Sequence, residues 1–193
     1  MIKKEPRLRV GIMERKTEIS GRLNGNFHTP QHPAHSFSGN FSVRARGDEI
    51  FLTASKGGET AARHSLNLLS GEQASFSLQD VTIGVSFHWE RQETQTFSGN
   101  LRLLSDGRGR LTVINDIALE DYLTSVISSE MSATAPMALL EAHAIISRSW
   151  LVAMLERGQS PFPASSPSRF ENEHIVWYGR EEHQFFDVCA DDH

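Results

Sequence analysis

The 193-residue chain is long enough for one generous domain, and its 38% hydrophobic and 22% charged content is ordinary for a water-soluble globular protein. A formal net charge of -5 argues against a nucleic-acid or anionic-membrane partner, because phosphate groups attract basic faces. The sequence has no run of about eighteen apolar residues and a single cysteine, so we expect neither a membrane span nor an internal disulfide.

The first part of the chain, to about residue 113, has the signals of short β-strands. Apolar and polar residues alternate in Leu8–Ile12 and in Phe41–Ala45, as they do along a strand with one buried face. The stretch Phe97–Leu103, followed by the turn residues Ser105-Asp106-Gly107 and by Gly109–Val113, predicts a hairpin. Three further segments are candidate strands: Glu49–Thr53, Val81–Phe87 and Leu111–Ile114.

Two consecutive helices are predicted after these strands. From Leu119 to Ser129, apolar residues recur at helical spacing. Pro136 suits the first position of a second helix, and Gly158 suits the left-handed cap that ends it. The second helix is apolar almost all round, which is normal for a buried helix. We therefore expect helices at about 118–130 and 136–157, the second of them buried.

Polar side chains interrupt the apolar pattern of the second helix at His143, Ser147 and Arg148. A buried arginine is costly unless it is paired, and a carboxylate would serve Arg148 best. Glu130, just where the first helix ends, is the candidate partner. Each of the three could instead lie on a stripe that meets solvent, and most glutamates in such connectors are solvated. Periodicity alone therefore does not define a site here.

The residues around the first helix resemble a known family. Asn115–Leu123 (NDIALEDYL), followed by Val126–Met131 (VISSEM), resembles the "N…LEDYL..V…SEM" signature of the SpoIID/LytB family. Leu140–Trp150 (LEAHAIISRSW) matches the family's "EALKAQAVAARTY" segment. The strong part of the resemblance covers roughly residues 111 to 155.

The resemblance implies lytic transglycosylase activity on bacterial peptidoglycan, with Glu130, the glutamate of "SEM", as the catalytic acid and base. Arg148, the arginine of "ARTY", would bind the substrate or a carboxylate, and we expect His143, Tyr122 and Ser129 to bind the glycan as well. Catalysis of this kind requires no cofactor. The chain departs from the family where glutamine, threonine and tyrosine are replaced, at His143, Ser149 and Trp150.

The end of the chain raises the question of a metal. His183, Cys189 and His193 lie close enough in sequence to share one, and zinc favours tetrahedral sets of cysteine and histidine. The resemblance to the SpoIID/LytB family implies a structural zinc held by a similar cluster near this point. Three ligands leave the set incomplete, so a fourth would come from beyond His193 or from solvent. Scattered surface histidines are the alternative.

We therefore expect an α+β fold, in which short antiparallel strands accompany two consecutive helices that carry the site at their junction. We divide it into a β-rich part, residues 1–110, and a SpoIID-like catalytic core, residues 111–193, that is truncated at its C-terminus. The expected reaction cleaves the bond between N-acetylmuramic acid and N-acetylglucosamine in glycan strands or fragments and gives anhydromuramic products.

The alternative function is a non-catalytic peptidoglycan-binding protein or amidase enhancer, whose partner would be an N-acetylmuramoyl amidase. The substrate points outside the cytoplasm, whereas the chain begins without the apolar segment of a signal peptide, so the location stays open.

Overall fold

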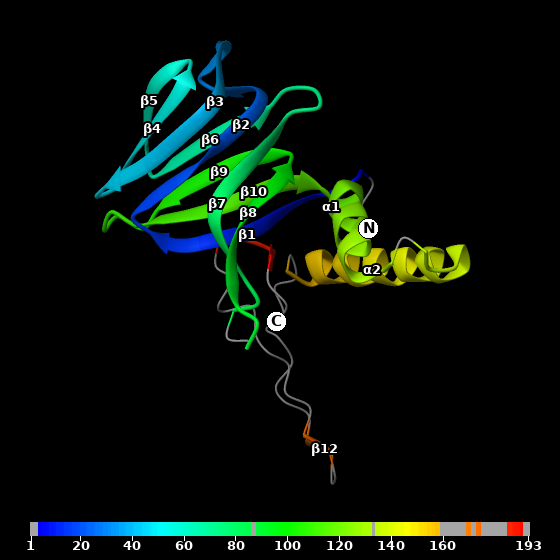
Figure 1. Cartoon of the computed structure of the whole chain (residues 1–193). Coiled ribbons are helices and arrows are strands. Elements are labelled where there is room, and N and C mark those ends of the chain that lie inside the picture. Colours follow the sequence, from blue (N-terminus) through cyan, green and yellow to red (C-terminus); the bar gives the residue numbers. More distant parts are fainter. Residues whose placement is uncertain are drawn as a thin grey trace.

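The computed structural model describes residues 4–85, 88–132, 134–158, 169–170, 173–174 and 185–190. Strands fill the first part of the chain and two helices follow (Figure 1). The strands before the helices are β1 (Arg7–Lys16), β2 (Glu18–Thr29), β3 (His32–Arg46), β4 (Glu49–Lys56), β5 (Gly58–Arg63), β6 (Ser65–Ser70), β7 (Ser75–Ile83), β8 (Arg91–Ser98), β9 (Asn100–Ser105) and β10 (Leu111–Ala118). The later elements are α1 (Leu119–Glu130), α2 (Met137–Gly158) and the two-residue strands β11 (Arg169–Phe170), β12 (Glu173–His174) and β13 (Val188–Cys189).

One mixed sheet of eleven strands organises the described part of the chain. Its order is β13-β1-β10-β9-β6-β2-β3-β4-β5, with β7 paired to β2 and β8 paired to β7. The strand β2 joins the two halves of the sheet, because it pairs with β6 through Phe27 and His28 and with β7 through Gly21–Asn24. β13 runs parallel to β1, whereas β10 is antiparallel to both β1 and β9.

Alternating residues of these strands form the main core. In β4, Ile50 and Leu52 are fully buried, while the residues between and beside them are exposed. They belong to one cluster with Leu101 and Leu103 of β9 and with Phe76 of β7, so both halves of the sheet face the same core. Burying a side chain of this size contributes about 1.5–3 kcal/mol. The main core is therefore formed mainly by side chains of the strands, and no helix residue belongs to it.

A second, smaller cluster attaches the helices to the sheet. Leu119 and Leu123 of α1 and Leu151 of α2 pack with Leu8 and Val10 of β1. Both helices consequently lie at one end of the sheet, beside β1 and the end of β10 (Figure 1).

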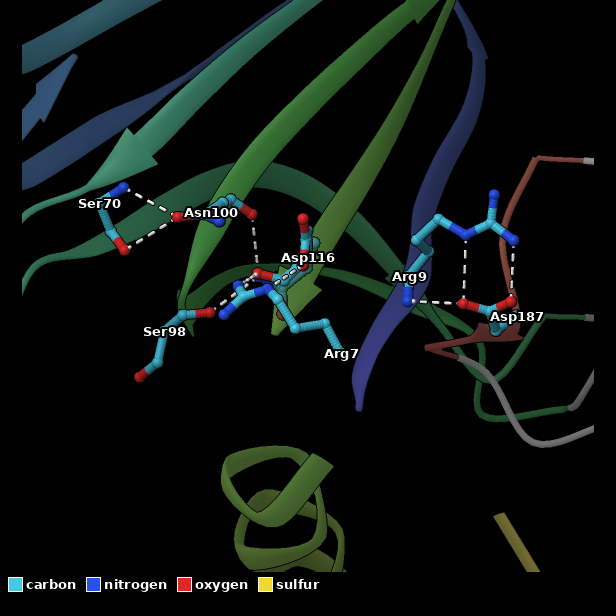
Figure 2. Close-up of polar contacts among 8 residues, drawn as sticks. Arg7, Arg9, Ser70, Ser98, Asn100, Asp116 and Asp187 are labelled. Carbon is cyan, nitrogen blue, oxygen red and sulfur yellow. Dashed lines mark hydrogen bonds and ion pairs between the residues drawn. The ribbon is translucent and has the colours of Figure 1, made fainter. Parts of the chain in front are cut away.

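The segment 185–190 is bound to the outer side of β1. Asp187 accepts three hydrogen bonds from Arg9: one from the backbone nitrogen at 2.9 Å, one from Nε at 3.2 Å and one from Nη2 at 2.9 Å (Figure 2). The ring of Phe186 is buried against Gly11, where no side chain stands in its way. These contacts place β13 at the edge of the sheet.

The α+β class expected from the sequence is wrong, because the described chain is largely β. The strands β2, β5, β6 and β8 were not anticipated, and the sheet contains strands as long as the 15 residues of β3. The helix bounds differ from the expected ones by at most one residue at each end, but the two helices are attached to one end of the sheet and do not organise the fold. The division of the chain after residue 110 stays a prediction.

The expected burial of the second helix is also wrong. The side chains of Met137, Ile145, Ile146 and Trp150 are 61–69% exposed, and Leu151 alone is buried among the side chains of α2 that the structure describes. The described neighbours of α2 reach only the stripe that contains Leu151. By length and composition, residues 137–156 are also apolar enough to cross a membrane, so the expected absence of a membrane span stays a prediction.

The predicted hairpin is confirmed as the antiparallel pair β9 and β10, in which Leu103 lies opposite Val113. Its turn is closed by Asp106, whose carboxylate accepts hydrogen bonds from the backbone nitrogens of Arg108 and Arg110 and from the guanidinium of Arg110. These bonds lower the pKa of Asp106, and the backbone bond from Arg108 contributes most.

Candidate functional site

A buried asparagine fixes the strand that leads into α1. Asn115 is 3% exposed, and its side-chain nitrogen donates to the carbonyl oxygens of Ser98 at 2.7 Å and Asn100 at 3.2 Å. The side-chain oxygen of Asn100 in turn accepts hydrogen bonds from the backbone nitrogen and the hydroxyl of Ser70 (Figure 2). The turn between β8 and β9 is therefore tied to β10 on one side and to β6 on the other.

The first turn of α1 is held by the beginning of the chain. Arg7 donates from Nε to the carboxylate of Asp116 at 2.5 Å and from Nη2 to the carbonyl of the same residue at 2.6 Å (Figure 2). The residue before the helix, Ala118, has no side chain that can cap it, and Glu5 supplies the missing acceptor to the backbone nitrogen of Glu120 at 3.0 Å. A carboxylate at this end also suits the helix dipole. These contacts fix the position of α1.

Glu130 is the last residue of α1, and its side chain is 50% exposed. Its Oε2 lies 3.0 Å from Nε2 of His143 on α2, and the side chain of His143 is 18% exposed. The other ring nitrogen of His143, Nδ1, is buried and has no hydrogen-bond partner among the residues that the structure describes. The structure thus brings together two residues that the sequence placed in the site without pairing them.

Arg148 does not contact Glu130, so the expected partner was wrong. It donates from Nε to Oε1 of Glu120 at 2.7 Å and from Nη2 to Oε2 at 2.6 Å. This paired geometry is the strong form of an arginine–carboxylate contact. The hydrogen bonds from Arg148 lower the pKa of Glu120, and those to Glu120 raise the pKa of Arg148.

Sequence reasoning missed Glu120 as a site residue, because a carboxylate in the first turn of a helix is already accounted for by the helix dipole. The available signal was its place in the "LEDYL" stretch, beside a helix that carries an arginine without a neighbouring acid.

The other predicted binding residues lie on α1. Tyr122 is half-buried and packs against the small cluster that attaches the helices. Ser129 is exposed, and its hydroxyl donates to the carbonyl of Val126 at 2.8 Å. Their binding to a glycan stays a prediction.

The predicted metal ligands are described only in part. Cys189 is half-buried in β13, whose backbone pairs with Gly11, whereas His183 and His193 lie outside the described residues. Within the described ranges, no three histidine, cysteine or carboxylate side chains gather closely enough to hold a metal ion. The zinc site at this end of the chain stays a prediction.

A groove of about 690 Å³ is lined in part by α1. Its lining includes Asp121, Thr124, Ser125 and Ser128 of α1 and Arg7 of β1. Hydroxyl groups of the sheet complete the lining at Ser70, Ser75 and Ser98. Such a surface offers hydrogen-bonding groups beside apolar surface, which includes Ala74 and Ala118.

Residues 107–193 match the family model described as SpoIID: Stage II sporulation protein. This confirms the resemblance over the part of the chain that contains α1 and α2, and it shows a SpoIID domain there. No curated protein and no solved structure gives a match. The family is linked to cell-wall lytic activity, and the match indicates a sporulation-related function at the cell wall.

Proposed function

We propose that this chain is a peptidoglycan lytic transglycosylase that cleaves the bond between N-acetylmuramic acid and N-acetylglucosamine, with Glu130 as its single general acid and base. The observation that carries the proposal is the environment of Glu130. Its carboxylate is half exposed at the end of α1, where a glycan can reach it, and one of its oxygens lies 3.0 Å from His143. The family match over this region supports a cell-wall glycan as the substrate.

In the first step, Glu130 donates its proton to the oxygen that bridges the two sugars. The bond from the muramyl anomeric carbon to that oxygen breaks, and the N-acetylglucosamine part leaves as an alcohol. Positive charge develops on the anomeric carbon and its ring oxygen, as in other glycosidic cleavages. Glu130 is then ionised and lies beside this charge.

In the second step, the hydroxymethyl oxygen of the same muramyl residue attacks its own anomeric carbon. Its proton passes to Glu130, which is thereby restored, and an anhydromuramic end is formed. Because the nucleophile is part of the substrate, no water has to be captured and oriented. One carboxyl group is therefore sufficient. Glu120, the other acid that α1 presents to α2, has both oxygens bound to Arg148 and is not needed.

The remaining polar groups of this region suit the binding of a glycan. Arg148 keeps 42% of its side chain exposed while it is paired with Glu120, so an acidic group of the substrate can still reach it. The groove beside α1 offers hydroxyl groups to the hydroxyls of a sugar. We assign substrate binding to Arg148, Tyr122, Ser129 and this groove.

The test is mass spectrometry of peptide-free glycan strands incubated with the wild type and with two variants. Glu130→Gln removes the proposed acid, whereas Glu141→Gln makes the same chemical change at an exposed position of α2. We expect anhydromuramic products from the wild type and from Glu141→Gln, and none from Glu130→Gln, which should still bind the strands.

Equal products from Glu130→Gln would place the acid elsewhere. If the folded wild type gives no products, the proposal fails in favour of the non-catalytic binding protein or amidase enhancer. The enhancer is then recognised on intact peptidoglycan, where an N-acetylmuramoyl amidase should release peptides faster with this chain present than without it.

A further inference from the structure

The contact between Glu130 and His143 restricts where the protons of the site can lie. Nε2 of His143 is 3.0 Å from Oε2 of Glu130, while Nδ1 is buried and no described residue forms a hydrogen bond with it. A buried N–H donor without an acceptor costs about 1–3 kcal/mol. A proton on Nδ1 would be such a donor, whereas a proton on Nε2 has the carboxylate to bind. A hydrogen on the ring therefore has an acceptor when it lies on Nε2, and none among the described residues when it lies on Nδ1.

We propose that His143 is a positioning residue, which donates its Nε2–H to Oε2 of Glu130 throughout the reaction and leaves Oε1 as the oxygen that exchanges the proton with the glycan. This inference rests on the proposed function of Glu130. It assigns different tasks to the two carboxyl oxygens: His143 holds one in place, and the other reacts.

The same hydrogen bond serves both halves of the reaction. Before cleavage, Oε1 of Glu130 carries the proton and Oε2 accepts from His143. After cleavage, the carboxylate is ionised and Oε2 still accepts from the same N–H, while Oε1 is free to take the proton of the muramyl hydroxymethyl group. The hydrogen of the His143 ring stays on Nε2 in both steps, so the buried Nδ1 never has to become a donor.

The position offers a matched pair of substitutions. Glutamine, which the family carries in the segment that resembles residues 140–150, also has an N–H that can donate to a carboxylate. Leucine is of comparable size and has no donor. His143→Gln therefore preserves the proposed bond, and His143→Leu removes it.

The first experiment measures kcat and KM for release of anhydromuramic ends by the wild type and these two variants, each shown to be folded by circular dichroism. We expect His143→Gln to keep kcat within about threefold, and His143→Leu to lose about 10- to 100-fold in kcat with little change in KM, because misplaced reacting groups cost rates of this order. A loss confined to KM would make His143 a substrate-binding residue, as the sequence suggested, and would overturn the positioning role. Unchanged kinetics in His143→Leu would overturn it as well.

The second experiment does not depend on activity. Nitrogen NMR of the histidine rings reports which ring nitrogen carries hydrogen, and we expect Nε2 of His143 to be protonated and Nδ1 not. The Nε2 signal should move in Glu130→Gln and stay in place in Glu141→Gln. A hydrogen on Nδ1 would refute the inferred bond. If the wild type releases no product, the proposed function fails, and so does the role of His143 in the reaction. The NMR spectrum still shows in that case whether Nε2 of His143 donates a hydrogen bond to Glu130.

Discussion

Replacing Gly11 by alanine is expected to detach the segment 185–190 from β1. A Cβ atom at this position would lie 2.6–2.7 Å from three atoms of the Phe186 ring, closer than such atoms approach one another in proteins. Phe186 is 6% exposed, so the ring can make room only by leaving its buried position. Sequence patterns alone give no reason for a glycine at this point of a strand.

The expected loss follows from the contacts of the segment. Burial of the ring is worth about 1.5–3 kcal/mol. The backbone bonds from Asp187 to the carbonyl of Arg9 at 2.8 Å and from Ala190 to the carbonyl of Gly11 at 2.9 Å contribute about 0.5–1.5 kcal/mol each. Alanine restricts the unfolded chain more than glycine does, and this effect raises the free energy of unfolding by up to about 1 kcal/mol. Gly11→Ala should therefore lower the free energy of unfolding by about 1.5–6 kcal/mol.

Urea denaturation of a double-mutant cycle with Phe186→Ala measures this coupling. In the Phe186→Ala background the obstructing ring is gone, so adding Gly11→Ala should change the free energy of unfolding by less than about 1 kcal/mol. If Gly11→Ala costs the same in both backgrounds, the explanation through Phe186 is refuted.

Two further changes test the contacts that position α1. Asn115→Ala removes the donor to the carbonyls of Ser98 and Asn100 and should lower the free energy of unfolding by about 1–3 kcal/mol in urea titrations; no change would show that the asparagine does not hold this turn. Glu120→Gln should cost less than about 1 kcal/mol at neutral pH, because its pair with Arg148 is exposed. Since Arg148 lowers the pKa of Glu120, this stabilisation is present above the ordinary value of 4.5 and lost as the pH falls through the lowered value. The stability difference between wild type and Glu120→Gln should therefore shrink on acidification, and a growing difference would contradict the pairing.

The sequence predicts those elements in which the spacing of apolar residues matches the side chains that are buried in the structure. β9 alternates buried and less buried residues, β10 does so on either side of its buried run Val113–Asn115, and Asp106 supplies the turn chemistry between them. The helix α1 shows its helical spacing because Leu119 and Leu123 face the sheet. In these cases the side chains that set the pattern are the ones that are buried.

The strands β5 and β8, which the sequence did not predict, and the helix α2 do not show this match. No described side chain of β5 or β8 is buried, so neither strand carries an apolar alternation, and both are held by backbone pairing with neighbouring strands. The opposite holds for α2, whose apolar residues are largely exposed. Composition indicates that a surface is apolar, but it does not show which neighbour covers it.

The sequence also does not predict which side chains of α1 and α2 contact each other. Glu120 and Glu130 lie at opposite ends of α1, and only the way in which α2 packs decides that Arg148 binds Glu120 and His143 binds Glu130. The sequence selected three of these four residues for the site, but it assigned Arg148 the wrong acid.

The central claim, that Glu130 works alone because the substrate supplies its own nucleophile, is tested most directly by running the reaction in water labelled with heavy oxygen. The account predicts anhydromuramic ends that contain no label, formed by the wild type and absent with Glu130→Gln. Labelled reducing ends would show that water attacks the anomeric carbon, which would require a group to activate it and would contradict the account.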